Sequence, residues 1–388
     1  MRDHGPAYGA PLKVLIIGGS GVFGSRLAKI AVREEGVSLT LAGRRKDALE
    51  AVSRELENPA DILVLDRDRI VASDLAPFDI VVDAAGPFQS SHTRVTEAAL
   101  EAGIAYIDLA DGREFVGEFP RFDAAAKSAG VPLITGASSI PALSHAMIDR
   151  MVIGWREISA IRVGIYPGNR APRGRSLVEA ILSYVGKPVR VFRDGQWQNV
   201  PGWGMTHRED IPGESKRWAS VCDTPEQDLL VSRYTPTRSA EFFAGLELGF
   251  LHLGLAALSQ LVRIKLLPSL RPFAAPMLWV AQRLLAFGSD RGAMTVRVEG
   301  VNAGGERQRS RAVLHADANR GPNVPILAVV ALIRRFRDGA APPAGAYACS
   351  GVLEYGEFAD LLAELGITVD FHEHNAAEQS DRLIPLTQ

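Results

Sequence analysis

The stretch LKVLIIGGSGVFGSRLAKIA, which begins at Leu12, constrains the fold more than any other part of the sequence. An apolar run of strand length leads into the spacing G-x-G-x-x-G, and a segment of helical periodicity follows. In such a unit the glycines permit a tight turn, the approach of a phosphate to the backbone, and close packing of helix on strand. N–H groups without an acceptor at the helix start then bind the anion. The alternative is a glycine-rich turn without a ligand. The predicted phosphate loop consists of Gly18, Gly19, Ser20, Gly21, Val22, Phe23 and Gly24.

Strand-like and helix-like segments alternate between residues 12 and 136. Such alternation predicts βαβ units and a parallel, doubly wound sheet with helices on both faces. We therefore expect an α/β fold of the Rossmann type in residues 1–140. The six predicted strands are LKVLIIGG, VSLTLAG, DILVLD, DIVVDAAGPF, IAYIDLADG and VPLITGA.

The pattern changes after Pro141. ISAIRVGIY, TVRVEGVN and SRAVLHADA predict strands without crossover helices, and PVRVFRDGQWQNV predicts a hairpin that turns at Asp194-Gly195. Residues 141–315 are therefore expected to form an α+β domain with an antiparallel sheet. NVPILAVVALIRRFRDG and GEFADLLAELG predict helices within residues 316–388.

The residues after the second predicted strand indicate which nucleotide fits the loop. An NAD site usually has an acidic residue there that binds the ribose hydroxyls. Here Arg44 and Arg45 follow the strand, and no carboxylate occurs before Asp47. Two guanidinium groups can hold a 2′-phosphate, which a carboxylate would repel. The pair favours NADP over NAD, and the alternative is a solvated helix start.

Two further loops are expected at the same edge of the sheet, where ligands of such folds bind. Asp66 ends the third strand, where it can contact adenine or cap the next helix. The turn Ala85, Gly86, Pro87 and Phe88 follows the fourth strand. Its small residues allow a nicotinamide and its ribose to lie against the backbone, and the alternative is an ordinary turn.

Proton chemistry requires a titratable side chain near that edge, because the cofactor itself carries the hydride. His92, Asp108 and Asp111 are the candidates, and Tyr106, Ser138 and Ser139 lie in the same loops and strand ends. His92 has the alternative of a surface histidine at a helix start. Asp108 has the alternative of a structural carboxylate at a strand end. The serines have the alternative of helix capping.

Composition excludes several classes of protein. A formal net charge of -2 favours neither nucleic acid nor an anionic surface as the partner of the whole molecule. Two cysteines cannot form a disulfide framework, and the first residues lack an apolar signal segment, so we expect a cytoplasmic protein. No cysteine or third ligand accompanies the two histidines of His372-Glu373-His374, so no metal site is predicted.

Residues 246–287 are unusually apolar. Their longest uncharged run is shorter than a bilayer span, and basic residues and prolines interrupt the segment. One interpretation is a pair of helices that are buried at an interface, either between domains or between the two subunits of a homodimer. The other is an interfacial element that contacts a membrane peripherally or admits a lipid-like substrate.

Several motifs together resemble the saccharopine dehydrogenase-like family of reductases. They are GGSGVFGSRLA, LAGRRKDALE, VVDAAGPFQ, EAGIAYIDLADG, GVPLITGASSIPALS, GSDRGAMTVRVEG, GPNVPILAVVALIRRF and GAYACSGVLEYGEF. The resemblance implies NAD(P) binding by the glycine loop, the arginine pair and the GPF turn. It also implies an inserted substrate or dimerisation domain and C-terminal helices that return to the first domain. The sequence departs from the family pattern at Ser91-His92 and at Ala110-Asp111-Gly112, where the substrate is expected.

The expected function is NADP-dependent hydride transfer to a C=N, C=O or activated C=C bond of a small or lipid-like metabolite. A non-catalytic NADP(H) sensor and a lipid-associated protein of the same fold are the alternatives.

Overall fold

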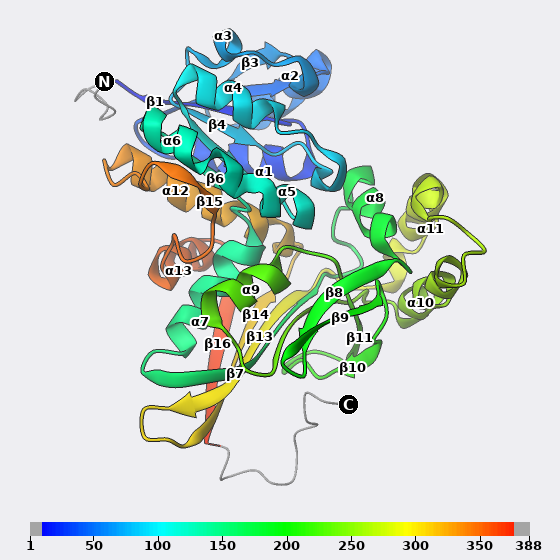
Figure 1. The fold of residues 1–388 in the computed structure, drawn as a ribbon. Coiled ribbons are helices and arrows are strands. Elements are labelled where there is room, and N and C mark those ends of the chain that lie inside the picture. Colours follow the sequence, from blue (N-terminus) through cyan, green and yellow to red (C-terminus); the bar gives the residue numbers. More distant parts are fainter. Residues whose placement is uncertain (1–9, 376–388) are drawn as a thin grey trace. The chain divides into compact units, whose positions relative to one another are not determined.

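The computed structural model describes residues 10–375, which form two compact units (Figure 1). The first unit contains the described residues up to 143, residues 172–180 and residues 322–362. The second contains residues 144–171, residues 181–321 and the described residues from 363 onward.

The first unit is built on a seven-stranded parallel sheet of order β15-β6-β5-β4-β1-β2-β3. The order reverses direction at β1, which lies between β2 and β4, and this is the position where doubly wound sheets bind ligands. The predicted α/β fold is confirmed, and all six predicted strands occur. The strands are β1 (Leu12–Ile17), β2 (Val37–Gly43), β3 (Asp61–Val64), β4 (Ile80–Asp83), β5 (Ala105–Asp108), β6 (Pro132–Thr135) and β15 (Gly345–Ala348).

Helices connect these strands and bury their apolar faces. In α1 the buried residues include Leu27, Ala28 and Ala31, at the spacing of one helix face. Glu34, which follows α1, pairs with Arg334 and Arg337 at 2.8 and 2.9 Å, so the returning segment is fixed against the N-terminal part of this unit. The helices are α1 (Val22–Ala31), α2 (Lys46–Glu55), α3 (Ala72–Leu75), α4 (Arg94–Ala102), α5 (Arg113–Glu118), α6 (Asp123–Ala129), α12 (Leu327–Arg337) and α13 (Tyr355–Glu364).

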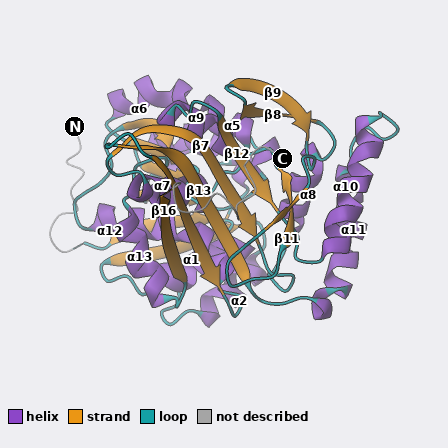
Figure 2. Cartoon of the chain, turned by 90° about the horizontal axis from the view of Figure 1, so that it is seen from below, coloured by secondary structure: helices purple, strands orange, loops and turns teal. Residues whose placement is uncertain are grey.

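The second unit is built on a mostly antiparallel sheet whose main path is β10-β11-β12-β7-β13-β14-β16 (Figure 2). Among the strand pairs of this sheet whose register is described, only β12 and β7 are parallel. The hairpin β8–β9 turns at Asp194 and Gly195, both with positive φ, as a two-residue turn of this type requires. The strands are β7 (Trp155–Tyr166), β8 (Pro188–Arg193), β9 (Gln196–Pro201), β10 (His207–Glu209), β11 (Arg217–Val221), β12 (Ser239–Ala244), β13 (Gly292–Asn302), β14 (Arg307–Ala316) and β16 (Thr368–Asn375).

The helices of this part of the chain are α7 (Ser144–Met151), α8 (Arg175–Tyr184), α9 (Glu226–Tyr234), α10 (Gly249–Arg263) and α11 (Ala274–Arg283). The first half of α8 belongs to the first unit. Among the described residues no helix is both long and apolar enough to cross a membrane.

The C-terminal part differs from the expectation of helices alone. The returning segment adds the strand β15 beside β6, and residues 363–375 leave the first unit to add β16 beside β14. Only the first half of TVDFHEHN, the residues TVDF, alternates polar and apolar side chains with the period of a strand. His372 and Glu373 are exposed on this strand, and the side chain of His374 lies outside the described residues. No cluster of metal-ligand type is found among the side chains described.

Candidate functional site

The glycine loop after β1 is held by contacts that leave no room for side chains. The N–H groups of Gly18 and Gly19 both donate to the carbonyl oxygen of Ala42, at 2.9 and 3.1 Å. A Cβ atom on Gly24 would lie 2.2 Å from the carbonyl oxygen of Gly18, so α1 approaches the loop backbone directly. The third glycine of the motif is therefore required by packing, as the sequence pattern predicts.

The start of α1 suits an anion. Gly21 is the N-cap residue, its φ and ψ are extended, and no side chain caps the helix. No acidic residue occurs in the first turn. A Cβ atom on Gly21 would come within 4 Å only of the carbonyl oxygen of Gly18, so the outer side of the loop is open. The free N–H groups of the first turn and the open approach fit a phosphate.

The loop after β4 lies against the glycine loop. A Cβ atom on Gly18 would meet backbone atoms of Ala84 and Ala85 at 3.1 Å, and the φ of Gly18 is +78°. Gly86 is exposed and Phe88 is buried, in the short 3-10 helix Phe88–Ser90. The structure thus brings together two of the predicted cofactor loops, at the carboxyl ends of β1 and β4.

Arg67 is the residue that fixes the loop after β4, and the sequence motifs did not single it out. Its guanidinium pairs with the fully buried carboxylate of Asp83 at 2.8 Å. It also donates hydrogen bonds to the carbonyl oxygen of Ala85 and to the Oγ of Ser91. The guanidinium carbon lies 5.2 Å from the centroid of the Phe88 ring. Burial raises the pKa of Asp83, and the charge of Arg67 opposes that rise.

A signal for Arg67 was present in the sequence. Asp83 ends a strand that is apolar throughout, and a carboxylate buried at such a place requires a cationic partner. The sequence offers Arg67 and Arg69 in the segment LDRDR, and only the folded chain selects between them.

Arg44 and Arg45 follow β2 at the same edge. Both are exposed, and in the described part of the chain neither side chain makes an ion pair or a hydrogen bond with another residue. Ala42 of β2 accepts the hydrogen bonds of the glycine loop, so the arginine pair begins two residues from that contact. Asp66 is exposed, and its carboxylate accepts a hydrogen bond from the N–H of Asp68 at 3.2 Å, which is the capping alternative.

Asp108 is buried completely at the end of β5. Its carboxylate accepts hydrogen bonds from the Tyr106 hydroxyl, the Thr135 hydroxyl and the N–H groups of Ala110 and Gly136, all at 2.8 to 2.9 Å. Burial raises the pKa of Asp108 to about 7. These bonds join the ends of β5 and β6, so the geometry favours a structural carboxylate over a group that meets a substrate.

Asp111 and His92 are more accessible than Asp108. Asp111 is half-buried and accepts a hydrogen bond from Gln89 at 3.0 Å, and burial raises its pKa above the usual range. His92 is exposed and lies two residues before α4 begins at Arg94. Of the three proposed proton donors, these two remain placed to meet a molecule at the sheet edge.

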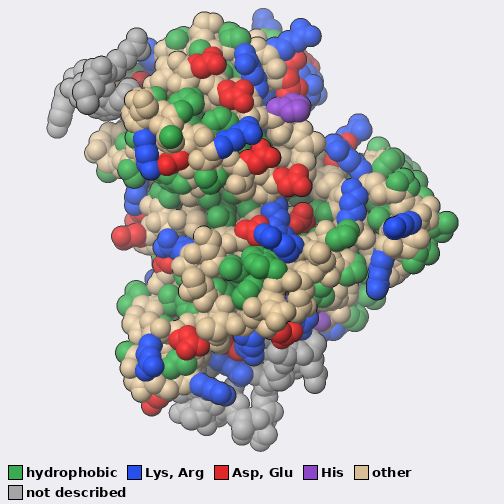
Figure 3. Space-filling view, viewed as in Figure 1, with side chains coloured by type: hydrophobic (Ala, Val, Ile, Leu, Met, Phe, Trp, Pro, Cys, Tyr) green, Lys and Arg blue, Asp and Glu red, His purple; other side chains and the backbone are tan. Residues whose placement is uncertain are grey.

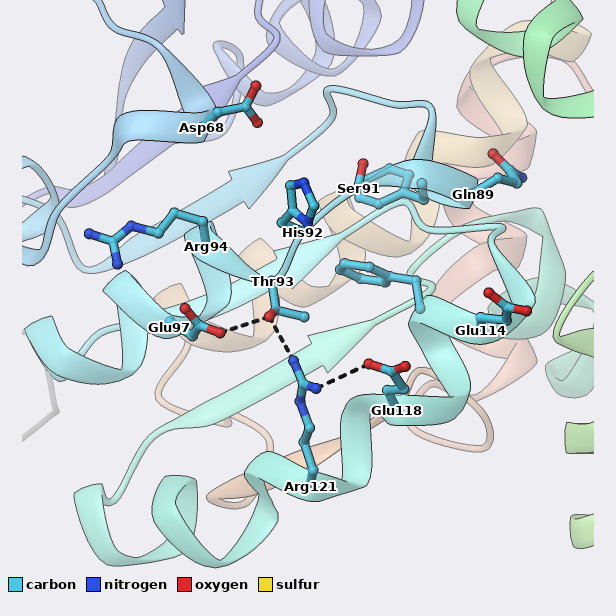
Figure 4. Close-up of a pocket in the computed structure, with 12 residues that line it drawn as sticks. Asp68, Gln89, Ser91, His92, Thr93, Arg94, Glu97, Glu114, Glu118 and Arg121 are labelled. Carbon is cyan, nitrogen blue, oxygen red and sulfur yellow. Dashed lines mark hydrogen bonds and ion pairs between the residues drawn. The ribbon is translucent and has the colours of Figure 1, made fainter. Parts of the chain in front are cut away.

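His92 also lines a cavity of about 610 Å³ in the first unit (Figure 4). Its walls come from Asp68 after β3, the segment after β4, the first turn of α4, α5, and Arg121 beyond α5. Arg121 donates to the Thr93 hydroxyl at 2.8 Å and pairs with Glu118 at 3.1 Å, and the Thr93 hydroxyl donates to Glu97 at 2.8 Å. None of the glycine-loop residues lines this cavity.

A family model matches the N-terminal part of the first unit. Residues 14–134 match the family model of the saccharopine dehydrogenase NADP binding domain. The matched range includes the glycine loop, the arginine pair and the turn after β4. It confirms the resemblance for the motifs up to residue 134, and it supports a pyridine nucleotide as the ligand of this unit.

Two solved structures share the fold over almost the whole chain. Apo saccharopine dehydrogenase (L-Glu forming) from Saccharomyces cerevisiae is 14% identical, with a TM-score of 0.67 over 94% of this chain and 100% of that chain. Homospermidine synthase from Legionella pneumophila, solved in complex with NAD, is 11% identical, with a TM-score of 0.63 over 97% of this chain and 96% of that chain. At these identities the likeness concerns the fold.

One curated relative is similar in sequence. A lipid droplet localized protein of Caenorhabditis elegans is 27% identical over 144 residues. The match covers 33% of this chain and 34% of the relative, so it spans about a third of each protein.

Proposed function

We propose that this protein is an NADP-dependent oxidoreductase of the saccharopine dehydrogenase-like type, which acts on a C=N, C=O or activated C=C bond of a small or lipid-like metabolite. The observation that carries the proposal is the uncapped, acid-free start of α1, which lies in a glycine loop packed against the loop after β4. Arg44 and Arg45 add two exposed cations beside that loop.

Each part of the site has a role in this proposal. The N–H groups of Val22, Phe23 and Gly24 hold the pyrophosphate, and Arg44 with Arg45 holds the 2′-phosphate. Gly86 leaves the backbone after β4 open to the nicotinamide end. When bound, NADPH supplies the hydride, and the protein orients the acceptor and supplies the proton.

Asp111 is our candidate for the proton donor. A carboxyl group whose pKa is raised by burial keeps its proton at higher pH, which is the property a general acid needs. His92 is the second candidate, because its imidazole is exposed after β4 and histidine is the side chain that most often acts as a general acid.

The cofactor assignment is tested by the double variant Arg44→Asp/Arg45→Ser. We expect NADPH affinity to fall at least tenfold while NADH affinity changes little, because only NADPH carries the 2′-phosphate. Fluorescence titration of each nucleotide measures both constants. Lys29→Asp/Arg33→Ser is the matched control, since it makes the same charge change at the far end of α1. Equal losses for both nucleotides in the test variant would contradict the NADP assignment.

A non-catalytic NADP(H) sensor is the second candidate function, and the structural use of Asp108 favours it. Oxidation of NADPH in the presence of a panel of imines, carbonyls and enoyl compounds distinguishes the two. Long-chain substrates belong in the panel, because the relative from Caenorhabditis elegans is named for lipid droplets. Turnover with any compound rejects the sensor, and tight NADPH binding without turnover favours it.

A further inference from the structure

The segment from α10 to residue 287 exposes large apolar side chains to solvent. Within the described chain, ten of the fifteen exposed large hydrophobic residues lie in this segment, so the exposure is concentrated rather than scattered. They are Phe250, Leu253, Leu258, Ile264, Leu266, Phe273, Trp279, Val280, Leu285 and Phe287.

The helix α10 carries apolar side chains on both of its faces. Its buried face consists of His252, Leu255, Ser259 and Val262, and its exposed face carries Phe250 and Leu258. The buried polar groups are satisfied. The Nε2 of His252 is 2.9 Å from the Oγ of Ser220, and Ser259 donates to the carbonyl oxygen of Ala256 at 2.6 Å. The face of Phe250 and Leu258 is therefore directed outward by specific contacts on the other face.

Close packing fixes α10 in this orientation. A Cβ atom on Gly186 would lie 2.4 Å from the carbonyl oxygen of Ser259 and 2.6 Å from the Cβ of Val262. The N–H of the Trp203 indole donates to the carbonyl oxygen of His252 at 3.3 Å. Rotation of α10 to bury Phe250 would break these contacts.

The helix α11 is almost free of buried side chains. Ala274 is the only one of its residues that is buried, although the helix reads AAPMLWVAQR. The Trp279 ring is 57% exposed and has the Arg283 guanidinium 4.7 Å from its centroid. Phe287, just beyond the helix, is 72% exposed. Indole and guanidinium side chains each combine an apolar body with a polar end, which suits them to a membrane–water boundary.

The charge of the segment has one sign. Residues 248–287 contain no Asp or Glu and four basic residues, namely Arg263, Lys265, Arg271 and Arg283. All four are exposed. In Figure 3 hydrophobic and basic side chains lie together over α10 and α11.

We propose that α10, α11 and the residues between and just after them, 249–287, dock this protein on an anionic phospholipid surface. The apolar side chains enter the boundary between headgroups and acyl chains, and the four cations pair with the lipid phosphates. The contact is peripheral. It is independent of the redox chemistry, because all of its residues belong to the second unit.

Charge also decides between a lipid surface and a second copy of the chain. An isologous contact places the same patch against itself. Four cations would then face four cations with no carboxylate of this segment to neutralise them. An anionic surface has the complementary charge.

Flotation of the full-length protein with vesicles tests the proposal. We expect the protein to float with phosphatidylcholine vesicles that contain phosphatidylglycerol, to float poorly with phosphatidylcholine alone, and to be released by high salt. Trp279→Ser/Phe287→Ser should lower the partition coefficient about a hundredfold, because two aromatic side chains no longer enter the lipid. Arg263→Gln/Lys265→Gln should lower it about tenfold at low salt.

Matched controls come from other exposed surfaces. Ile153→Ser/Val64→Ser removes two exposed apolar side chains elsewhere, and Arg156→Gln/Lys216→Gln removes two exposed cations elsewhere. Both controls should float like the parent protein, and the melting temperature of each variant confirms its fold. No flotation of the parent with anionic vesicles would overturn the proposal. So would equal losses in test and control variants. A dimer in analytical ultracentrifugation that Trp279→Ser/Phe287→Ser dissociates, without flotation of the parent, would assign the surface to a second copy instead.

Discussion

At the glycine loop of the first unit, backbone atoms approach so closely that a single methyl group would collide, whereas in residues 249–287 of the second unit aromatic rings stand in solvent. Both regions are rich in residues that a globular core would use. Gly18 and Gly24 are fixed by what touches them, and Trp279 and Phe287 touch little within the chain. Measurements can therefore separate the two regions. Substitutions at Gly18 or Gly24 should change the free energy of unfolding, whereas substitutions at Trp279 or Phe287 should change only the binding of a partner.

The largest effect on stability is expected at Arg67. Arg67→Met leaves the carboxylate of Asp83 buried without its cation, and breaking such a pair costs about 3–5 kcal/mol. The pKa of Asp83 should rise further in the variant, so the loss of stability should grow as pH increases. Urea unfolding at several pH values measures it.

The double variant Arg67→Met/Asp83→Asn provides the control, because it removes the buried charge together with its partner. We expect it to recover a large part of the stability that Arg67→Met loses. A double variant as unstable as the single one would show that the hydrogen bonds of Arg67 to the loop, rather than the ion pair, carry the effect.

Gly24→Ala is expected to have the next largest effect within the first unit. The new Cβ would lie 2.2 Å from the carbonyl oxygen of Gly18, so the loop must shift at a cost of about 1–3 kcal/mol. NADPH binding should weaken as well, because the same shift moves the start of α1. Gly117→Ala in α5 is the control, since no atom lies within 4 Å of its Cβ position. An alanine there should be neutral or stabilising. Equal destabilisation by the two substitutions would contradict the close packing described for the loop.

In the second unit, the buried carboxyl group of Glu226 makes the free energy of unfolding depend on pH, which the exposed side chains of residues 249–287 should not do. Burial raises the pKa of Glu226 to about 8 and lowers the pKa of His145, 3.7 Å away, to about 3, so both are neutral at pH 7. Between the unfolded and folded pKa of Glu226 the folded state holds a proton that the unfolded state has lost. The stability of the parent should therefore fall as pH rises through this window. His145 contributes the opposite slope only below its unfolded pKa, about 6.5.

Glu226→Gln isolates this term. Between about pH 6.5 and 8 the parent should lose about 2 kcal/mol relative to the variant, because glutamine cannot ionise. Chemical unfolding at both pH values measures the difference. Parallel pH profiles for parent and variant would show that Glu226 is ionised in the folded protein.

The sequence predicted what depends on local pattern and missed what depends on pairing. The six strands up to β6 were identifiable because parallel strands covered on both faces are rich in apolar residues, as Ile80, Val81 and Val82 of β4 illustrate. The four-residue strand GAYA of β15 has no such signal, because its place beside β6 depends on a chain return over two hundred residues long. Asp108 was recognisable as a strand-end acid, but two of its four hydrogen bonds come from Thr135 and Gly136, which are distant in the sequence. Arg67 could not be predicted for the same reason, because its ion pair with Asp83 joins residues that are not neighbours in the sequence.

The smallest effect on stability is expected on the outer face of α10. Phe250 is 60% exposed, so Phe250→Ser should change the free energy of unfolding by no more than about 0.5 kcal/mol. Leu255, five residues later, is 6% exposed, and Leu255→Ala should cost about 2–5 kcal/mol because it leaves a cavity. Urea unfolding of the two variants in the absence of lipid measures both. A large loss for Phe250→Ser would mean that its ring is covered in solution, as a second copy of the chain would cover it, and the vesicle proposal would then fail on the same surface that carries it.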